Sequence, residues 1–164
     1  MTANKPKQLI DILQTMVDLS TQFNELLLKE KKALENSNSE LLLDVSTAKK
    51  SLAIRLEHST KTAHTFLNNI KLNKGLYGLG DFIKRMKPSD SQRQLTQHWL
   101  DIQSLTEANK QLNDANGAII ELNRRHAQRS IDILHGHTGN NNSATYGADG
   151  QAMKKRAGRK ISVA

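Results

Sequence analysis

The sequence predicts an all-α protein, built from a long antiparallel helical hairpin, a third long helix and a disordered C-terminal tail. Apolar residues recur at steps of three and four along most of the chain. Only two prolines interrupt 164 residues, and most of the nine glycines cluster in two places. The hydrophobic fraction of 37% lies below the roughly 45–50% of typical globular domains. These features favour a thin, elongated three-helix bundle or coiled coil over a thick core.

The first predicted helix follows Pro6 and runs from about Lys7 to Glu35. At ~1.5 Å per residue it would be roughly 40 Å long. Its apolar positions define one helical face, which needs a partner to cover it. They are Leu9, Ile12, Leu13, Met16, Leu19, Phe23, Leu26, Leu27 and Leu34.

The second predicted helix begins after the polar turn of residues 36–39. Ser37 and Glu40 have the spacing of a capping box, so we expect Ser37 to cap this helix. Because the turn is short and both helices are amphipathic, they should form an antiparallel hairpin. The apolar positions of the second helix are Leu41, Leu42, Val45, Ala48, Leu52, Leu56, Ala63, Phe66, Leu67 and Ile70.

A break is predicted between Asn73 and Asp81, where Gly75, Gly78 and Gly80 make a flexible corner. Residues 82–86 form at most one helical turn before Pro88. The third helix then starts at the capping residues 89–91 and runs to about His135, with Gly136 as its stop. Trp99 is expected to anchor this helix against the hairpin.

Two stripes with heptad spacing run along the third helix. One is apolar, with Leu105, Leu112 and Ile119, and His126 follows at the next position. The other is polar, with Asn109, Asn116 and Asn123. An apolar stripe needs a partner helix, and buried asparagines select particular pairings at a cost in stability. The pattern is therefore typical of a binding protein, although a second copy of the chain could also cover the open stripe and form a homodimer.

The composition divides the chain into a helical domain, residues 1–135, and a tail, residues 136–164. The tail has low hydrophobicity and no period, which predicts disorder. It contributes five cations and one acid to a net charge of +8, and the cations are Lys154, Lys155, Arg156, Arg159 and Lys160. These could attract nucleic acid, anionic lipid or an acidic protein. We favour the simpler interpretation, a solvated tail.

The sequence carries few patterns typical of catalysis or cofactor binding. The chain has no cysteine and no GKS/GKT or GxSxG motif, and its glycine trio lacks the preceding strand of a phosphate loop. His135 and His137 alone make a weak metal site. We therefore expect neither an enzyme nor a cofactor. The N-terminus does not match a signal peptide, and no stretch reaches the ~18 apolar residues of a membrane span, so we expect a cytoplasmic protein.

Three stretches of the sequence resemble the FlgN family of flagellar type III export chaperones. The first is LLLKEKKAL (residues 26–34), continuing into residues 41–52. The second is NDANGAII (residues 113–120) in the third helix. The third is TYGADGQ (residues 145–151) in the tail, which folding alone does not require. Together these stretches span nearly the whole chain.

The resemblance implies that the chain binds hook-associated proteins of the hook–filament junction before export. It places the client-binding face on the third helix and the contact with the cytoplasmic domain of the export gate at Tyr146. The basic segment 154–160 departs from the family pattern and leaves room for another role of the tail. The client-binding residues would be Leu105, Leu112, Asn116, Ile119, Ile120 and Asn123.

Two other functions remain open from the sequence. A basic helical protein associated with nucleic acid would show affinity that falls steeply with salt. Against it, the basic cluster has no interleaved aromatic residues and no recognised binding fold is present. A structural coiled-coil adaptor would instead form a stable oligomer and have no free client-binding state.

Overall fold

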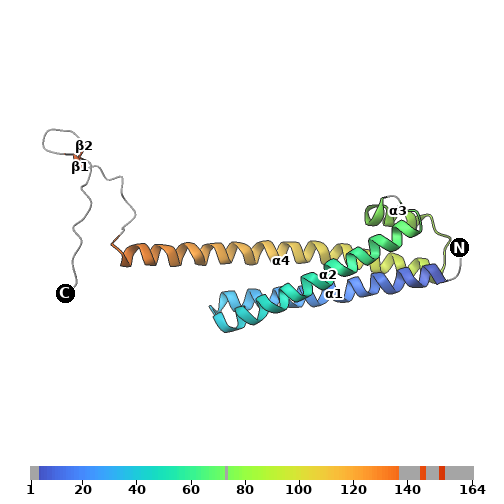
Figure 1. Ribbon diagram of the computed structural model, residues 1–164, viewed down its shortest axis with the longest axis horizontal. Coiled ribbons are helices and arrows are strands. Elements are labelled where there is room, and N and C mark those ends of the chain that lie inside the picture. Colours follow the sequence, from blue (N-terminus) through green and yellow to red (C-terminus); the bar gives the residue numbers. More distant parts are fainter. Residues whose placement is uncertain (1–3, 73, 137–144, 147–151, 154–164) are drawn as a thin grey trace. The chain divides into compact units, whose positions relative to one another are not determined.

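The computed structural model describes residues 4–72, 74–136, 145–146 and 152–153. Two long helices, α1 (Asn4–Glu35) and α2 (Ser39–Asn69), form a hairpin. A short 3-10 turn η1 (Gly75–Gly78) and helix α3 (Leu79–Lys84) lead to the long helix α4 (Asp90–Leu134) (Figure 1). The predicted all-α class, with a helical hairpin followed by a third long helix, is confirmed. No helix among the described residues is long and apolar enough to cross a membrane.

The chain divides into two compact units, Met1–Ile120 and Glu121–Ala164. The second unit contains the end of α4 and two strands, β1 (Thr145–Tyr146) and β2 (Ala152–Met153), which pair antiparallel with Tyr146 opposite Ala152. Most of the predicted tail, residues 136–164, lies outside the described residues. The boundary predicted between residues 135 and 136 therefore stays a prediction.

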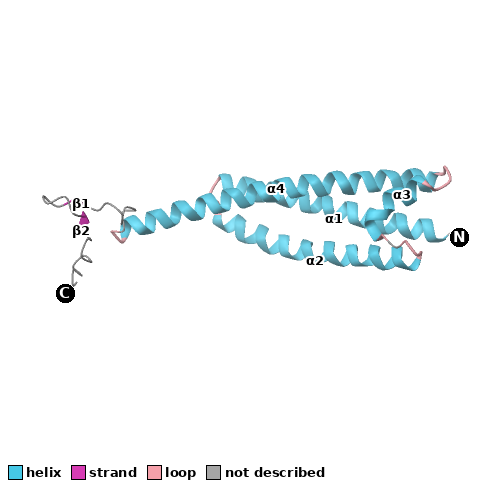
Figure 2. Cartoon of the chain, turned by 90° about the horizontal axis from the view of Figure 1, so that it is seen from above, coloured by secondary structure: helices cyan, strands magenta, loops and turns pink. Residues whose placement is uncertain are grey.

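Helix α1 lies between the other two long helices of the first unit (Figure 2). Its first buried stripe follows steps of four and three, with one step of seven from Ser20 to Leu27, which keeps these side chains facing a neighbouring helix. A second buried row, seven residues apart, widens the stripe so that α1 can pack against two partners; it consists of Leu19, Leu26 and Ala33. The first stripe consists of Leu9, Leu13, Met16, Ser20, Leu27, Glu30 and Leu34.

The two partners of α1 run in opposite directions. Glu30 near the end of α1 pairs with Lys49 near the start of α2, whereas Leu9 near the start of α1 shares a core cluster with Leu67 near the end of α2. The hairpin is therefore antiparallel, as predicted. Helix α4 instead runs parallel to α1, because successive contacts between them advance together along both chains, as the hydrogen bonds described below show.

The turn between α1 and α2 differs from the predicted capping box. Ser37 is not the cap: its φ is 51°, and its N–H donates to Leu34 O at 3.3 Å while Asn38 N–H donates to Ala33 O at 2.9 Å. This is a Schellman ending of α1 with Ser37 in the left-handed position that favours glycine. Asn38 caps α2 instead, since its side-chain oxygen accepts from Leu41 N–H at 3.0 Å.

The predicted glycine-rich break is a compact corner at the end of the bundle. Gly75 adopts a φ of +53°, and a Cβ atom there would lie 2.9 Å from His64 Nδ1. A Cβ atom on Gly80 would lie 3.1 Å from Trp99 Nε1. Both glycines therefore allow close approach, and α3 can bury Leu79 and Ile83 in the core. Trp99 packs against the same core, in agreement with the sequence prediction.

The ends of α4 follow the expected capping chemistry. Ser89 Oγ accepts from Gln92 N–H at 3.2 Å, which satisfies one free donor in the first turn. At the other end Gly136 has a φ of +74° and its N–H donates to Ile133 O at 2.9 Å. A glycine in this conformation commonly ends a helix, so the predicted stop at Gly136 is confirmed.

Replacing Ser37 with glycine should stabilise the protein. Ser37→Gly removes the penalty of a Cβ atom in the left-handed region, which costs roughly 1 kcal/mol. Urea denaturation should show an increase of about that size in the free energy of unfolding. As a control, Ser46→Gly in exposed α2 should lower it by roughly 0.5 kcal/mol, because glycine is a poorer helix former than serine. A destabilised Ser37→Gly protein would contradict the Schellman assignment.

Candidate functional site

The face of α4 that packs on α1 carries four positions spaced seven residues apart. Leu95 and Ile102 are buried at the start of this row. Asn109 and Asn116 follow, and Asn116 is fully buried. The row therefore changes from apolar to polar halfway along the contact with α1, without leaving the buried face.

Both asparagines bind backbone carbonyls of α1. Asn109 Nδ2 donates to Ser20 O at 3.0 Å, and Asn116 Nδ2 donates to Leu27 O at 2.9 Å. The donor and acceptor residues are 89 positions apart in both pairs. The same bond therefore recurs after seven residues on both helices, which requires that α1 and α4 run parallel and in register. Asn24 Nδ2 adds a bond to Asn109 Oδ1 at 2.8 Å.

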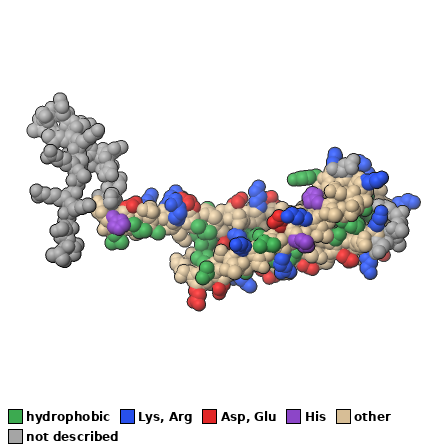
Figure 3. Space-filling view, in the orientation of Figure 1, with side chains coloured by type: hydrophobic (Ala, Val, Ile, Leu, Met, Phe, Trp, Pro, Cys, Tyr) green, Lys and Arg blue, Asp and Glu red, His purple; other side chains and the backbone are tan. Residues whose placement is uncertain are grey.

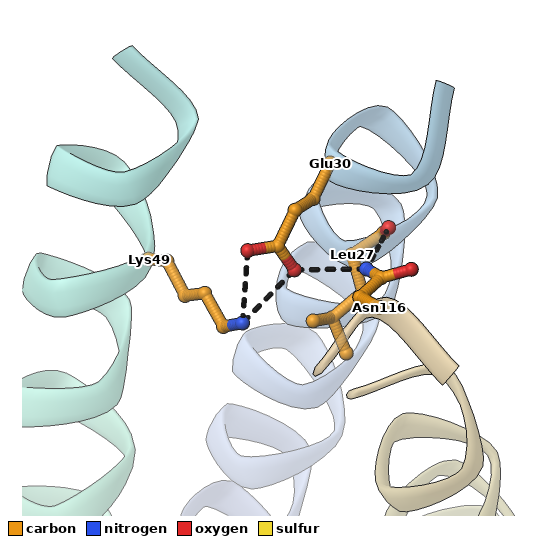
Figure 4. A network of polar contacts seen from close by, with 4 residues as sticks. All are labelled: Leu27, Glu30, Lys49 and Asn116. Carbon is orange, nitrogen blue, oxygen red and sulfur yellow. Dashed lines mark hydrogen bonds and ion pairs between the residues drawn. The ribbon is translucent and has the colours of Figure 1, made fainter. Parts of the chain in front are cut away.

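A polar network around Asn116 joins all three long helices (Figure 4). The second amide hydrogen of Asn116 reaches Glu30 Oε2 at 2.8 Å. Lys49 Nζ from α2 lies 3.1 Å from Glu30 Oε1 and 2.9 Å from Glu30 Oε2. Glu30 is a buried carboxylate, and such a group is tolerated when a cation and hydrogen-bond donors compensate its charge.

Helix α4 exposes apolar side chains beyond this network. In the first unit, Ile119 is half-buried and Ile120 is 47% exposed. In the second unit, every α4 residue from 121 to 131 is exposed, and four large apolar side chains between residues 121 and 134 are 46–84% exposed. These are Leu122, Ile131, Ile133 and Leu134.

Local pairs between side chains stabilise the exposed part of α4. Arg124 holds Glu121 with two hydrogen bonds of 2.9 Å, and Arg125 Nε lies 3.6 Å from the same carboxylate. The hydrogen bond from Arg124 holds the pKa of Glu121 below its usual value, and the carboxylate raises the pKa of Arg124. Pairs three and four residues apart stabilise a helix without tertiary contacts. These pairs therefore support the helix in a segment whose large apolar side chains are exposed.

Comparison with known proteins identifies the family. The family model described as FlgN protein matches residues 1–154. The chain belongs to the FlgN family. A relative in Proteus mirabilis, named Flagella synthesis protein FlgN, is 38% identical over 78 residues. That alignment covers 47% of this chain and about half, 51%, of the relative. No solved structure matches the chain.

The FlgN family is a family of flagellar chaperones. The residues that the resemblance assigned to client binding differ in their solvent exposure. Leu105, Leu112 and Ile119 are half-buried, and Ile120 and Asn123 are exposed. Asn116 is the exception, because it is fully buried and both of its amide hydrogens are bonded to α1. We therefore exclude Asn116 from the candidate surface.

Two features of the candidate site were not predicted from the sequence, and a third lies outside the described side chains. The partner of Asn109 and Asn116 is the chain's own α1, which the heptad spacing could have suggested because Ser20 and Leu27 are also seven residues apart. Leu122 was missed as an exposed residue. The side chain of Tyr146 lies outside what the structure describes, and only its backbone pairing in β1 is defined.

The histidines do not assemble into a metal site in the described part of the chain. No group of three or more His, Asp or Glu residues that could hold a metal ion occurs there. His126, at the end of the apolar stripe, is exposed, and His137 lies outside the described residues.

Removing Lys49 should destabilise the three-helix junction. Lys49→Met leaves the Glu30 carboxylate buried without its cation, and the free energy of unfolding should fall by roughly 2 kcal/mol. The double variant Lys49→Met/Glu30→Leu should recover part of this loss, because no uncompensated charge remains. Lys50→Met, at an exposed neighbouring position, is the matched control and should change stability by less than about 0.5 kcal/mol. Equal effects of Lys49→Met and Lys50→Met in urea denaturation would contradict the role of the network.

Proposed function

We propose that this protein is a cytoplasmic flagellar export chaperone, which binds hook-associated proteins through the exposed apolar side chains of α4. The observation that supports the proposal most directly is Ile120, a large apolar side chain left 47% exposed directly after the buried Asn116 contact, in a member of the FlgN family. The exposed part of such a side chain gives no hydrophobic stabilisation until another molecule covers it.

The proposed client-binding residues divide by unit. In the first unit the surface consists of Leu105, Leu112, Ile119 and Ile120, and in the second unit Asn123 and Leu122 extend the set. Spacing of three, four and seven residues suits an amphipathic helix of the client, which packs its apolar face against such a row. Asn123 is exposed one heptad after Asn116, so its amide is placed to donate to a client as Asn116 donates to α1.

Moderate affinity follows from the partial exposure of this surface. Burial contributes about 25 cal/mol per Å² of apolar surface, and ordering costs offset part of it. Leu105, Leu112 and Ile119 are already half-buried, so each has only part of its area left to contribute. A chaperone must release its client, and a surface that gains only part of the full burial energy permits release. Covering the client's apolar face would keep client molecules from associating with one another before export.

Delivery to the export gate would use Tyr146, in the segment that resembles the family's tail. An aromatic side chain buries a large area for few rotatable bonds, which suits an anchor that docks without disturbing the client surface. The cytoplasmic domain of the gate is the proposed partner of this residue.

A charge at the centre of the proposed surface should weaken client binding. Ile120→Asp is expected to lower the affinity for hook-associated proteins by at least about tenfold, because a carboxylate resists burial against an apolar partner. Isothermal titration calorimetry against candidate clients measures the change. Leu100→Asp is the matched control, since Leu100 is 54% exposed on the same helix but outside the proposed set, and it should bind clients normally. If the two variants behave alike, Ile120 has no special role.

Removing the tail tyrosine should separate the two binding activities. Tyr146→Ala is expected to keep client affinity and to weaken binding to the export-gate domain in a pull-down, because only the anchor is lost. Tyr77→Ala removes the other tyrosine, which is 95% exposed in η1, and should leave both interactions intact. Loss of client binding in Tyr146→Ala would mean that the two sites have been assigned to the wrong segments.

A further inference from the structure

The end of the first unit that contains α3 holds an open apolar pocket. Its volume is about 220 Å³, and helices α1, α2, α3 and α4 all contribute to it. Leu9 and Leu95, both buried, belong to its lining, and the other apolar lining residues are half-buried. These are Phe66, Ile70, Phe82 and Met86. The core cluster leaves this space unfilled, although a closely packed interior normally contains few voids larger than a water molecule.

Two cations belong to the same pocket. Among the described residues, Lys5 from α1 and Arg85 from the end of α3 are the charged ones that line it. Arg85 is exposed and Lys5 is half-buried, so both can meet a ligand from solvent. Neither forms a salt bridge with a carboxylate in the described part of the chain.

The surroundings of the pocket are strongly basic. Segments 4–10 and 70–90 together hold seven Lys and Arg residues and two Asp residues, a net charge of +5. Lys and Arg side chains gather at this end of the first unit in the space-filling view (Figure 3). This positive charge attracts acidic groups, whereas a neutral apolar ligand gains nothing from it.

From the pocket and its charge we infer that this end of the bundle binds an acidic peptide segment carrying one bulky apolar side chain. The apolar side chain enters the pocket formed by Phe66, Ile70, Phe82 and Met86, and carboxylates beside it pair with Lys5 and Arg85. The pocket volume suits one or two side chains rather than a larger ligand. The chain's own tail does not match, because residues 137–164 hold five cations and one acid.

This surface is separate from the proposed client surface. Its residues belong to α3, to the end of α2 and to the start of α1 and α4, whereas the client residues begin at Leu105. The inference therefore goes beyond the proposed function, and the two can fail independently. It gives the chaperone a second docking site, for a partner of opposite charge.

Fluorescence anisotropy with a labelled synthetic peptide tests the inference. The probe has one central phenylalanine flanked on both sides by glutamates. We expect saturable binding that weakens by at least about tenfold when alanine replaces the phenylalanine, and that weakens as salt is added. Lysine-flanked peptide should not bind.

Variants of the protein separate the pocket from general charge attraction. Met86→Trp fills the pocket and should weaken binding of the probe peptide by at least about tenfold. Leu43→Trp, at a 71% exposed position, is the matched control and should leave this binding unchanged. Ile70→Trp is the second pocket-filling variant, used if circular dichroism shows that Met86→Trp is misfolded. Lys5→Glu/Arg85→Glu should abolish binding, whereas Lys50→Glu/Lys110→Glu, with the same net charge, should bind nearly normally.

Three results would overturn the inference. One is the absence of saturable binding. Another is equal affinity for the phenylalanine and alanine peptides, which would leave charge attraction alone. The third is tight binding to vesicles containing anionic lipid that Met86→Trp does not change, which would indicate a membrane-binding surface. Client binding measured on the same variants should remain normal, so a failure here leaves the proposed function untouched.

Discussion

The arrangement of the first unit depends on how α1 satisfies two neighbours at once. Its stripe of buried positions packs antiparallel to α2 and parallel to α4, and the hydrogen bonds from Asn109 to Ser20 O and from Asn116 to Leu27 O define the register with α4. An apolar seam alone tolerates small shifts along the helix axis. A buried amide does not, because a shift leaves donors without partners and each such group costs about 1–3 kcal/mol.

The network of Glu30, Lys49 and Asn116 adds specificity where the apolar contact is weakest. Leu95 and Ile102 bury large side chains early in α4, but the later heptad positions are asparagines, which give less hydrophobic stabilisation. Asn116 Oδ1 is itself buried without a hydrogen-bond partner among the described residues, a further cost at this point. The seam with α1 thus weakens toward Ile120, and the apolar residues of α4 become exposed there. The proposed client surface begins where these internal partners end.

Much of this could be predicted from the sequence, because heptad spacing directly reports which side chains share a helix face. The three long helices, the corner at the glycines and the stop at Gly136 all follow from spacing and backbone chemistry. The prediction that Ser37 caps α2 was wrong. Asn38 can fill the same role one residue later, and Ser37 adopts a left-handed conformation that the identity of its side chain does not predict. Asn116 was placed on the client surface because periodicity identifies a face but not the helix that covers it. The contact between Glu30 and Asn116 depends on the parallel register of α1 and α4, and no local sequence pattern reveals that register.

Thiol cross-linking in the cysteine-free chain tests the central claim most directly. Ser20→Cys/Asn109→Cys places two thiols at one observed contact between α1 and α4, and a short bifunctional thiol reagent should join them within the monomer. Ser20→Cys/Asn116→Cys shifts one partner by seven residues, about 10 Å along the helix, and should not be joined. The reverse outcome, or equal cross-linking of both pairs, would contradict a parallel seam in fixed register between α1 and α4.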